Sequence, residues 1–166
     1  MAKITLKGSP FTTSGDLPKV GTKAPSFRLV SSSLEDVTLE QFKGKKKIIS
    51  IVPSLDTPVC ATSTKRFDEH AAKDKNVAVF VVSADLPFAQ GRFCSAESTL
   101  HVITLSMMRD RHFARDYGVL IQDGPLAGIT ARAVVVLDGD DKVLHAELVS
   151  EIAHEPNYIA AIAAAK

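Results

Sequence analysis

The sequence predicts one α/β domain spanning residues 1–166, built on a mixed β-sheet that is flanked by helices. The first observation is a strand, helix, strand succession at 47–52, 58–73 and 76–82, the order typical of a parallel βαβ unit. The second is a pair of apolar runs within 133–148, separated by a turn sequence, which predicts an antiparallel hairpin. A sheet that contains both units is mixed.

The first third of the chain predicts three small elements ahead of the βαβ unit. Residues 4–13 alternate apolar and polar side chains around the turn cluster Gly8-Ser9-Pro10, which indicates an N-terminal β-hairpin. After a loop at 21–25, we expect an extended piece at 27–30 and a helical stretch at 39–42. The hairpin is expected to cap the domain.

The rest of the chain continues the alternation of strands and helices and then changes character. The elements expected after the βαβ unit are, in order, a helix at 87–97, a strand at 101–105, a charged helix at 110–117 that ends at Gly118, antiparallel strands at 133–137 and 142–148, and a closing helix at 156–165. The turn between the antiparallel strands is Asp138-Gly139-Asp140-Asp141.

The composition excludes several classes of protein. Lys and Arg total 20 against 19 for Asp and Glu, so no broad positive surface is expected to attract nucleic acid or an anionic membrane. Residues 1–20 contain no long apolar segment, and neither a signal peptide nor a membrane span is predicted. Two cysteines are too few for a disulfide scaffold. We expect a cytoplasmic protein that acts on small molecules or other proteins.

Cys60 lies where a buried strand turns into a helix, a place where α/β sheets form sites. Pro58 is typical of a first helical position and Thr57 of an N-cap, which makes Cys60 the third residue of the helix. Backbone N–H groups of a first turn carry the positive end of the helix dipole, and they stabilise a thiolate relative to the thiol. The segment therefore predicts a reactive cysteine.

An inert cysteine fits the same positions. Cys60, Thr64, Phe67 and Ala71 fall on one helical stripe, as core residues do. Free cysteine is also among the most buried residue types. Position and spacing alone leave both interpretations open.

Ionisation alone does not make a cysteine fast, because nucleophilicity falls with the pKa of a thiol. Donors must also point at the atoms on which negative charge develops. Thr57 offers a hydroxyl one turn before the cysteine, and Arg132 offers a permanent cation at the start of an apolar strand. Alternatively, Arg132 lies at a strand end that is exposed to solvent and has no role in the site.

Two segments that contain the cysteines resemble a known family. The pattern PxxxTxxC at 53–60 is similar to the active-site motif of the peroxiredoxins, and SADLPFAQGRFC at 83–94 resembles the thiol peroxidase subfamily. The resemblance extends through 123–128 and 131–135 and covers nearly the whole chain. It implies a thioredoxin-like fold with an added N-terminal β-hairpin.

The resemblance also implies a mechanism. Cys60 matches the peroxidatic cysteine, which hydrogen peroxide or an organic hydroperoxide oxidises to a sulfenic acid. Cys94 matches the resolving cysteine, which closes an intramolecular disulfide with it. Thr57 and Arg132 match the groups that hold peroxide and thiolate, and Pro53 matches the proline that shields the thiolate. Thioredoxin is the implied reductant of the disulfide, the relatives are homodimers, and no cofactor is implied.

Arg109 has two interpretations. In the segment Met107-Met108-Arg109-Asp110 it matches a second arginine near the pocket of the family, although the surrounding residues align less well. Arginines in this region also alternate with Asp110 and Asp116, a pattern expected for an exposed helix face.

Closing the implied disulfide requires a movement. Bridged cysteines have Cα atoms within about 7 Å of each other, a distance that cysteines in separate helices need not satisfy. Gly91 costs roughly 1 kcal/mol inside a helix. Few apolar anchors follow Pro87 in the same segment, namely Phe88, Ala89 and Phe93. We therefore expect the helix at 87–97 to unwind locally and deliver Cys94.

Other functions compete for the same residues. A thioredoxin-like binding or structural domain would keep both cysteines as packing residues or as a static crosslink. A disulfide reductase or isomerase typically carries Cys-x-x-Cys, which the chain lacks. The lysine-rich run at 43–47 is interpreted as a solvated lead-in to a strand, not as a phosphate site. No metal site is predicted, because five histidines show no paired spacing: His70, His101, His112, His145 and His154.

Overall fold

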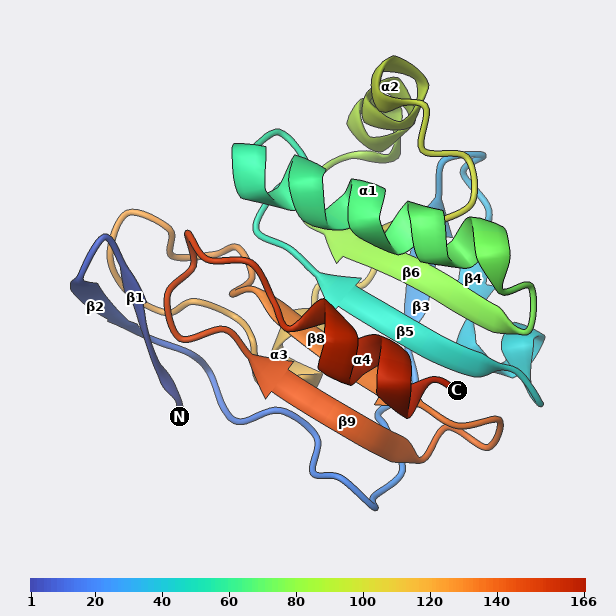
Figure 1. Ribbon diagram of the computed structural model, residues 1–166. Helices are drawn as coiled ribbons and strands as arrows, with labels where there is room; N and C mark the ends of the chain where they lie inside the picture. The colour runs from blue at the N-terminus through green and yellow to red at the C-terminus, as the bar shows by residue number, and fades with distance from the viewer.

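The computed structural model describes residues 1–166 and contains a seven-stranded sheet, a separate two-stranded sheet and five helices (Figure 1). The strands are β1 (Lys3–Leu6), β2 (Ser9–Thr12), β3 (Arg28–Ser31), β4 (Asp36–Thr38), β5 (Lys46–Ile51), β6 (Val77–Ser83), β7 (Ile103–Ser106), β8 (Ala133–Leu137) and β9 (Val143–Leu148). The helices are the 3-10 helix η1 (Leu39–Phe42), α1 (Pro58–Lys73), α2 (Pro87–Glu97), α3 (Phe113–Asp116) and α4 (Tyr158–Ala164). None of them has both the length and the apolar character that a membrane crossing requires.

The central sheet has the strand order β4-β3-β7-β6-β5-β8-β9. Strand β5 runs parallel to β6, and β6 runs parallel to β7, with α1 connecting β5 to β6 as the βαβ pattern predicts. Strand β8 lies antiparallel to β5, and β9 lies antiparallel to β8. The mixed sheet expected from the sequence is confirmed.

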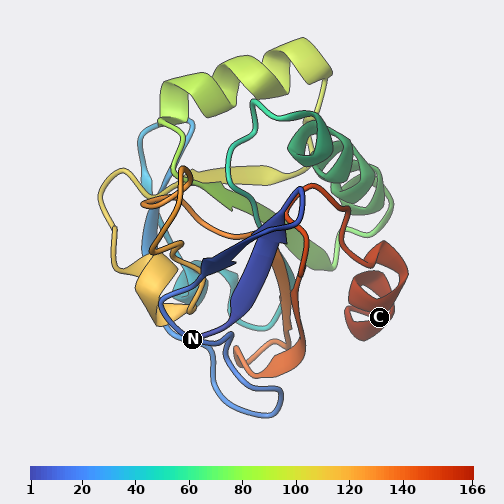
Figure 2. The same ribbon diagram turned by 90° about the vertical axis from the view of Figure 1, so that its left-hand side faces the viewer.

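Alternate residues of the central strands enter two separate cores, because successive side chains of a strand point to opposite faces. Ile48 and Val79 belong to the core that α1 and α4 cover. Ile49 and Phe80, their neighbours along β5 and β6, belong to the core that contains α3. Figure 2 shows the sheet between these two layers, with α2 at its upper edge.

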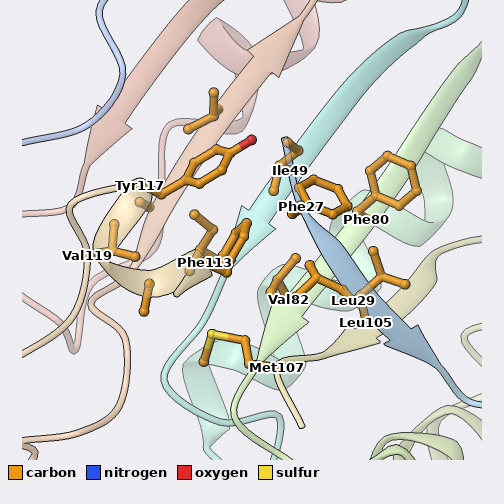
Figure 3. Packing of buried hydrophobic residues seen from close by; sticks show 14 of the residues in the cluster. Phe27, Leu29, Ile49, Phe80, Val82, Leu105, Met107, Phe113, Tyr117 and Val119 are labelled. Carbon is orange, nitrogen blue, oxygen red and sulfur yellow. The ribbon is translucent and has the colours of Figure 1, made fainter. Parts of the chain in front are cut away.

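The core on the α3 side is built around aromatic rings (Figure 3). Phe27 meets Phe80 and Phe113 edge to face, with ring centroids 6.4 and 5.6 Å apart. Tyr117 stacks on Phe113 at 4.5 Å and donates its hydroxyl hydrogen to the carbonyl of Pro25 at 2.9 Å. Burial raises the pKa of Tyr117, so the phenol stays protonated and keeps this bond.

The predicted N-terminal hairpin is present and docks on the body of the protein. Its residues Ile4 and Phe11 are buried in the core on the α3 side. The Phe11 ring lies against Gly124, where an added Cβ atom would come within 1.9 Å of it. Asp123 accepts hydrogen bonds from the amide and the hydroxyl of Thr12, both at 2.8 Å. Asp123 and Gly124 therefore hold the hairpin in place.

The charged helix expected at 110–117 is shorter than predicted. The carboxylate of Asp110 accepts hydrogen bonds from the amides of Arg28 and His112, at 3.2 and 3.1 Å, and Asp110 itself lies before the helix. Such bonds compete with helical backbone pairing, and the helix therefore begins only at Phe113. Strand β4 was not predicted at all, because three residues are too few to show a period.

The prediction that the run at 43–47 is solvated is wrong for Lys47. Its side chain is completely buried, and its Nζ atom pairs with Oδ1 of Asp141 at 2.6 Å. A buried ammonium group needs such a partner, and Asp141 comes from the distant turn between β8 and β9. This pairing can be seen only once the sheet is folded, because the two residues are far apart in the sequence. Lys43 and Lys45 of the same run are exposed, as expected.

Candidate active site

Cys60 occupies the third position of α1, with Pro58 at the first position and Thr57 at the N-cap, as predicted. Its side chain is completely buried in the core between α1 and the sheet, as is that of Phe67. Burial alone would also fit an inert packing residue. The sulfur atom also makes a polar contact besides this packing.

The sulfur atom touches a buried cation. Arg132 donates a hydrogen bond from Nη1 to the Sγ atom of Cys60 at 3.3 Å, and another from Nε to the carbonyl of Ile152 at 2.9 Å. Arg132 is only 2% exposed, which rules out a solvated strand end. A guanidinium group does not lose its proton, and water screens its charge little in a buried site. The sulfur of Cys60 therefore lies beside a fixed positive charge.

Thr57 and Pro53 both lie in the loop between β5 and α1. The Thr57 hydroxyl donates to the carbonyl of Ser54 at 3.0 Å and does not cap the helix. Because its only hydrogen is used there, it is free to accept a hydrogen bond from another molecule. Pro53 is buried just after β5, and the carbonyl of the preceding Val52 accepts a hydrogen bond from Thr130 Oγ1 at 2.9 Å.

Asp85 joins the loop before Cys60 to the start of α2. Its carboxylate accepts hydrogen bonds from three donors, all at 2.8 Å: Ser54 Oγ, the Leu55 amide and Ser83 Oγ. The Ser83 hydroxyl also accepts a hydrogen bond from Nε2 of Gln90 at 3.0 Å. A single carboxylate thus connects the segment before one cysteine with the helix that contains the other.

Cys94 lies in the C-terminal half of α2 and is half-buried, and both cysteines are free thiols. The residues that hold α2 in place are Pro87 and Gln90, which are its buried residues. Gln90 donates to the carbonyl of Leu105 at 2.9 Å in addition to Ser83. Its Oε1 atom is buried without a partner, so the anchor is only partly satisfied.

The apolar anchors predicted for α2 do not behave as expected. Phe88 is 68% exposed and Ala89 is exposed, whereas Phe93 alone packs against the core that contains Cys60. A pocket of about 420 Å³ opens between α2 and the loop at 54–56. The two cysteine-bearing segments are therefore joined before the start of α2 by Asp85 and at its end by an ion pair between Lys65 of α1 and Glu97, with the pocket between these two connections.

The chain beyond α2 is fastened to α1. Asp68 accepts hydrogen bonds from the amides of His101 and Val102, at 2.6 and 2.8 Å, and meets Nδ1 of His101 at 3.2 Å. Burial alone would raise the pKa of the Asp68 carboxyl group, but these hydrogen bonds outweigh burial and the pKa falls below its ordinary value. The segment containing Cys94 is thus held at both of its ends.

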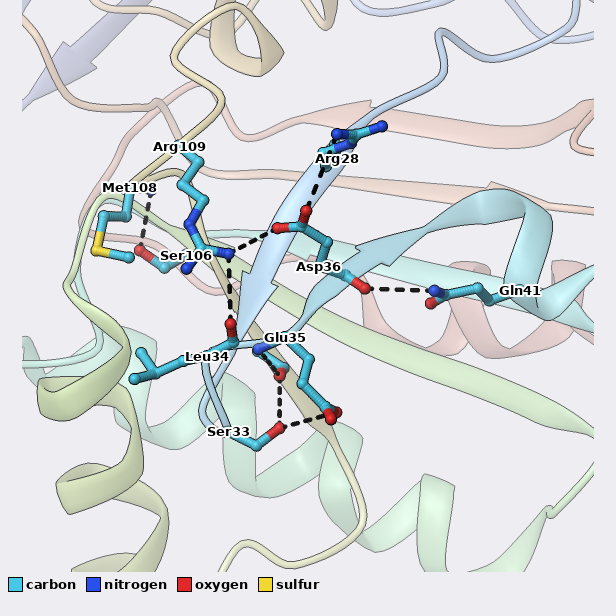
Figure 4. Close-up of polar contacts among 10 residues, drawn as sticks. Arg28, Ser33, Leu34, Glu35, Asp36, Gln41, Ser106, Met108 and Arg109 are labelled. Atoms are coloured by element: carbon cyan, nitrogen blue, oxygen red, sulfur yellow. Dashed lines mark hydrogen bonds and ion pairs between the residues drawn. The ribbon is translucent and has the colours of Figure 1, made fainter.

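Arg109 is engaged at the turn between β3 and β4 (Figure 4). It donates from Nη1 to Oδ1 of Asp36 at 2.8 Å and to the carbonyl of Leu34 at 3.3 Å. These bonds tie that turn to the loop after β7. None of them involves Cys60, so they give no support to a second arginine at the pocket.

The histidines make no common site. His101 pairs with Asp68, while His70 and His145 each have a buried ring nitrogen without a partner. No three His, Cys, Asp or Glu side chains gather in a way that would hold a metal ion.

Sequence reasoning missed the contributions of Ile152, Asp85 and Gln90. Ile152 acts through its backbone carbonyl, a group that every residue has, so no side-chain pattern marks it. Asp85 gave a usable signal, since it lies shortly after the end of the buried strand β6, at the edge of the sheet where sites form. Gln90 gave none, because a polar residue in a helix is normally exposed.

Comparison with known proteins defines the class to which this fold and site belong. Residues 19–162 match the family model described as Redoxin. The chain therefore belongs to the Redoxin family, and its fold is thioredoxin-like with an N-terminal hairpin, as expected.

More similar relatives narrow the class. The chain is 54% identical over 164 residues to the thiol peroxidases of Mycobacterium bovis and Mycobacterium tuberculosis, an alignment that covers 99% of this chain and 98% of theirs. A peroxiredoxin-like protein from Aquifex aeolicus superposes with a TM-score of 0.92 at 44% identity, covering 99% of this chain and 96% of that one. A thiol peroxidase from Chromobacterium violaceum superposes with a TM-score of 0.88 at 25% identity, and the superposition covers 95% of this chain and 91% of that one. The protein is a peroxiredoxin-type peroxidase, which reduces peroxide with a cysteine.

Proposed function

We propose that the protein reduces hydrogen peroxide and organic hydroperoxides through a cycle that starts at Cys60 and passes through an intramolecular disulfide with Cys94. The observation that carries the proposal is the hydrogen bond from Arg132 to the Cys60 sulfur in a buried site. The arginine and the first turn of α1 act on the same atom, and both favour the thiolate, which is the nucleophilic form.

In the first step, the Cys60 thiolate attacks one oxygen of the peroxide. A sulfur–oxygen bond forms, the oxygen–oxygen bond breaks, and the sulfur loses two electrons to the peroxide. The departing oxygen takes up a proton and leaves as water or as an alcohol. Arg132 stabilises the charge that develops on this oxygen, and Thr57 accepts a hydrogen bond from the peroxide O–H. Pro53, buried beside the loop, shields the thiolate from water.

In the second step, the Cys94 thiolate attacks the sulfur of the Cys60 sulfenic acid. A disulfide bond forms, the sulfur–oxygen bond breaks, and the oxygen leaves as water after protonation. Cys94 reaches the sulfenic acid by local unwinding of α2. The exposed Phe88 and the pocket beside the helix support this movement, because neither holds α2 against the rest of the protein.

In the third step, a dithiol reductant returns the disulfide to two thiols, and thioredoxin is the proposed reductant. One of its thiolates attacks the disulfide, and its second thiol releases the enzyme as the reductant itself becomes a disulfide. The cycle needs a compartment in which the reductant stays reduced, so the cytoplasm expected from the sequence fits it.

We also propose that the protein acts as a homodimer. Leu86 and Phe88 are 52% and 68% exposed, and Leu86 borders a pocket of about 440 Å³ whose lining includes Met107 and Met108 beside Arg111. Exposed apolar groups of this size favour a protein contact, and a second copy offers the same surface in a two-fold arrangement. Sedimentation should show a dimer for wild type and a monomer for Phe88→Glu. A wild type that stays monomeric at high micromolar concentration would overturn this part of the proposal.

Peroxide consumption coupled to thioredoxin and its reductase tests the cycle. We expect turnover by wild type and none by Cys60→Ser. Cys94→Ser should consume one equivalent of peroxide and then stop as a sulfenic acid, or consume further equivalents as that acid is over-oxidised. A static binding domain predicts instead that peroxide leaves the mass and the thiol content of wild type unchanged, and that result would refute the proposal.

A further inference from the structure

The carboxylate of Glu151 caps the turn of the N-terminal hairpin. It accepts hydrogen bonds from Thr5 Oγ1 at 2.8 Å and from the amides of Lys7 and Gly8, at 3.0 and 3.3 Å. It also accepts one from the amide of Ala153 at 3.2 Å. The Thr5 hydroxyl is the largest of several donors that lower the pKa of Glu151 to about 2, so the carboxylate is ionised at every pH at which a thiol enzyme works.

Backbone hydrogen bonds also join β1 to the segment that contains Glu151. Thr5 in β1 donates its amide to the carbonyl of Ser150 at 2.7 Å, and Ile152 donates its amide to the carbonyl of Thr5 at 2.8 Å. These bonds add β1 as a short parallel partner to the segment that leads from β9 to α4. Figures 1 and 2 both show the hairpin beside this segment. The hairpin therefore fixes the backbone on both sides of Glu151.

This segment carries the acceptor that orients the active-site arginine. The carbonyl of Ile152 accepts the hydrogen bond from Nε of Arg132 at 2.9 Å, and Nη1 of the same planar group reaches the Cys60 sulfur. Because a guanidinium is rigid, the direction of the Nε–H bond sets the direction of the Nη1–H bond. A shift of the Ile152 carbonyl would therefore move the donor away from the sulfur.

The use of a neutral carbonyl has an electrostatic advantage. No carboxylate lies within ion-pair distance of Arg132, whose hydrogen bonds go only to the Ile152 carbonyl and the Cys60 sulfur. An aspartate or glutamate in the same place would orient the arginine but cancel its charge. The carbonyl orients the guanidinium and leaves its full charge to the thiolate.

We infer that Glu151 is a positioning residue for the reaction, and that the N-terminal hairpin serves the active site through it. Glu151 fastens β1 to the segment that holds the Ile152 carbonyl, and this carbonyl aims Arg132 at Cys60. The inference rests on the proposed role of Arg132 at the thiolate. It assigns to the hairpin a function in catalysis besides covering the core.

The test uses the full chain with Cys94→Ser as background, so that one thiol reports. Glu151→Ala and the milder Thr5→Val are compared in two measurements: the pH profile of Cys60 alkylation and the single-turnover rate of peroxide reduction at pH 7. For Glu151→Ala we expect the midpoint of the profile to rise by roughly half a pH unit or more. The peroxide rate should fall by about tenfold, as when a catalytic group is misplaced. Thr5→Val should change the midpoint and the peroxide rate in the same directions but by less, because it removes only one of the bonds to Glu151. This variant can still be measured if Glu151→Ala folds poorly.

Asp123→Ala is the matched control, because Asp123 holds β2, the other strand of the same hairpin, through Thr12. It should lower the melting temperature but leave the pH profile in place. Equal shifts in Asp123→Ala and Glu151→Ala would overturn the inference, since the hairpin would then act through general stability alone. Arg132→Met distinguishes a failure of the role inferred for Glu151 from a failure of the proposed function. If Arg132→Met shifts the profile and Glu151→Ala and Thr5→Val do not, only this inference fails, whereas an unshifted Arg132→Met refutes the proposed function.

Discussion

Arg132 and Cys60 meet at 3.3 Å in a site where both are almost completely buried. A buried cation without a carboxylate partner is costly, and a thiolate at this position offsets that cost. The pair also resists screening by salt, since water has little access to it. The reactivity that we propose for Cys60 is therefore tied to one contact between distant parts of the chain.

Replacing Arg132 should slow the reaction with peroxide. Arg132→Met removes both the charge and the donor, and we expect a loss of about 10²- to 10³-fold in the single-turnover rate, the size typical of a lost transition-state donor. Arg132→Lys keeps the charge but has no Nε–H for the Ile152 carbonyl, and its rate should lie in between. Stopped-flow measurements check this. Arg28→Met, at an exposed arginine, is the control, and an equal loss there would contradict the assignment.

Replacing Gln90 should loosen α2. Gln90→Ala removes two hydrogen bonds that hold the helix to Ser83 and Leu105, and we expect amide exchange at 91–96 to accelerate by about tenfold. If unwinding limits disulfide formation, that step should become faster as well. Hydrogen exchange and rapid-mixing mass analysis measure both quantities. Gln122→Ala, at an exposed glutamine, serves as control, and slower disulfide formation in Gln90→Ala would argue against unwinding.

The contribution of Asp68 should depend on pH. Its pKa in the folded protein lies below the ordinary 3.8, so the folded state keeps the carboxylate after the unfolded chain has begun to take up protons. The stabilisation is complete above about pH 5 and is lost as pH falls through the folded-state pKa. Urea unfolding of wild type and Asp68→Asn should give a difference of roughly 1–2 kcal/mol at pH 7 that narrows below pH 3.8. A difference that stays constant down to pH 2.5 would show that the charge is not involved.

Gly118 should not tolerate a side chain. It has a φ angle of +69°, and an added Cβ atom would come within 2.2 Å of the carbonyl oxygen of Asp16. We expect Gly118→Ala to lower the free energy of unfolding by about 2–4 kcal/mol, combining the left-handed backbone and the overlap. Gly21 has a similar φ angle of +89° but open space around it, so Gly21→Ala should cost only about 1 kcal/mol. Urea unfolding of both variants tests the difference.

The sequence predicted the elements whose signals are local. The helix at 58–73 and the strand at 133–137 have the expected bounds, because Pro58 marks a helix start and a continuous apolar run marks a buried strand. The position of Cys60 in the first turn follows from the same proline. In these places propensity and tertiary packing favour the same structure.

Features that depend on distant partners could not be predicted. Lys47 looks solvated until Asp141 is brought beside it by the β8–β9 turn. The sequence pattern places Asp110 in a helix, but in the folded chain its carboxylate accepts a hydrogen bond from the amide of Arg28. The orientation of Arg132 likewise depends on a backbone carbonyl whose position only the folded chain defines.

The bridge made by Asp85 bears on how quickly the two sulfur atoms meet. Because Asp85 keeps the chain just before α2 beside the loop that precedes Cys60, unwinding of α2 leaves Cys94 on a short tether that begins at Asp85. A short tether confines the second thiol near the first and gives it a high effective concentration. In the cycle that we propose, small thiols from solution then compete poorly for the oxidised sulfur, because Cys94 reacts with it before they can bind.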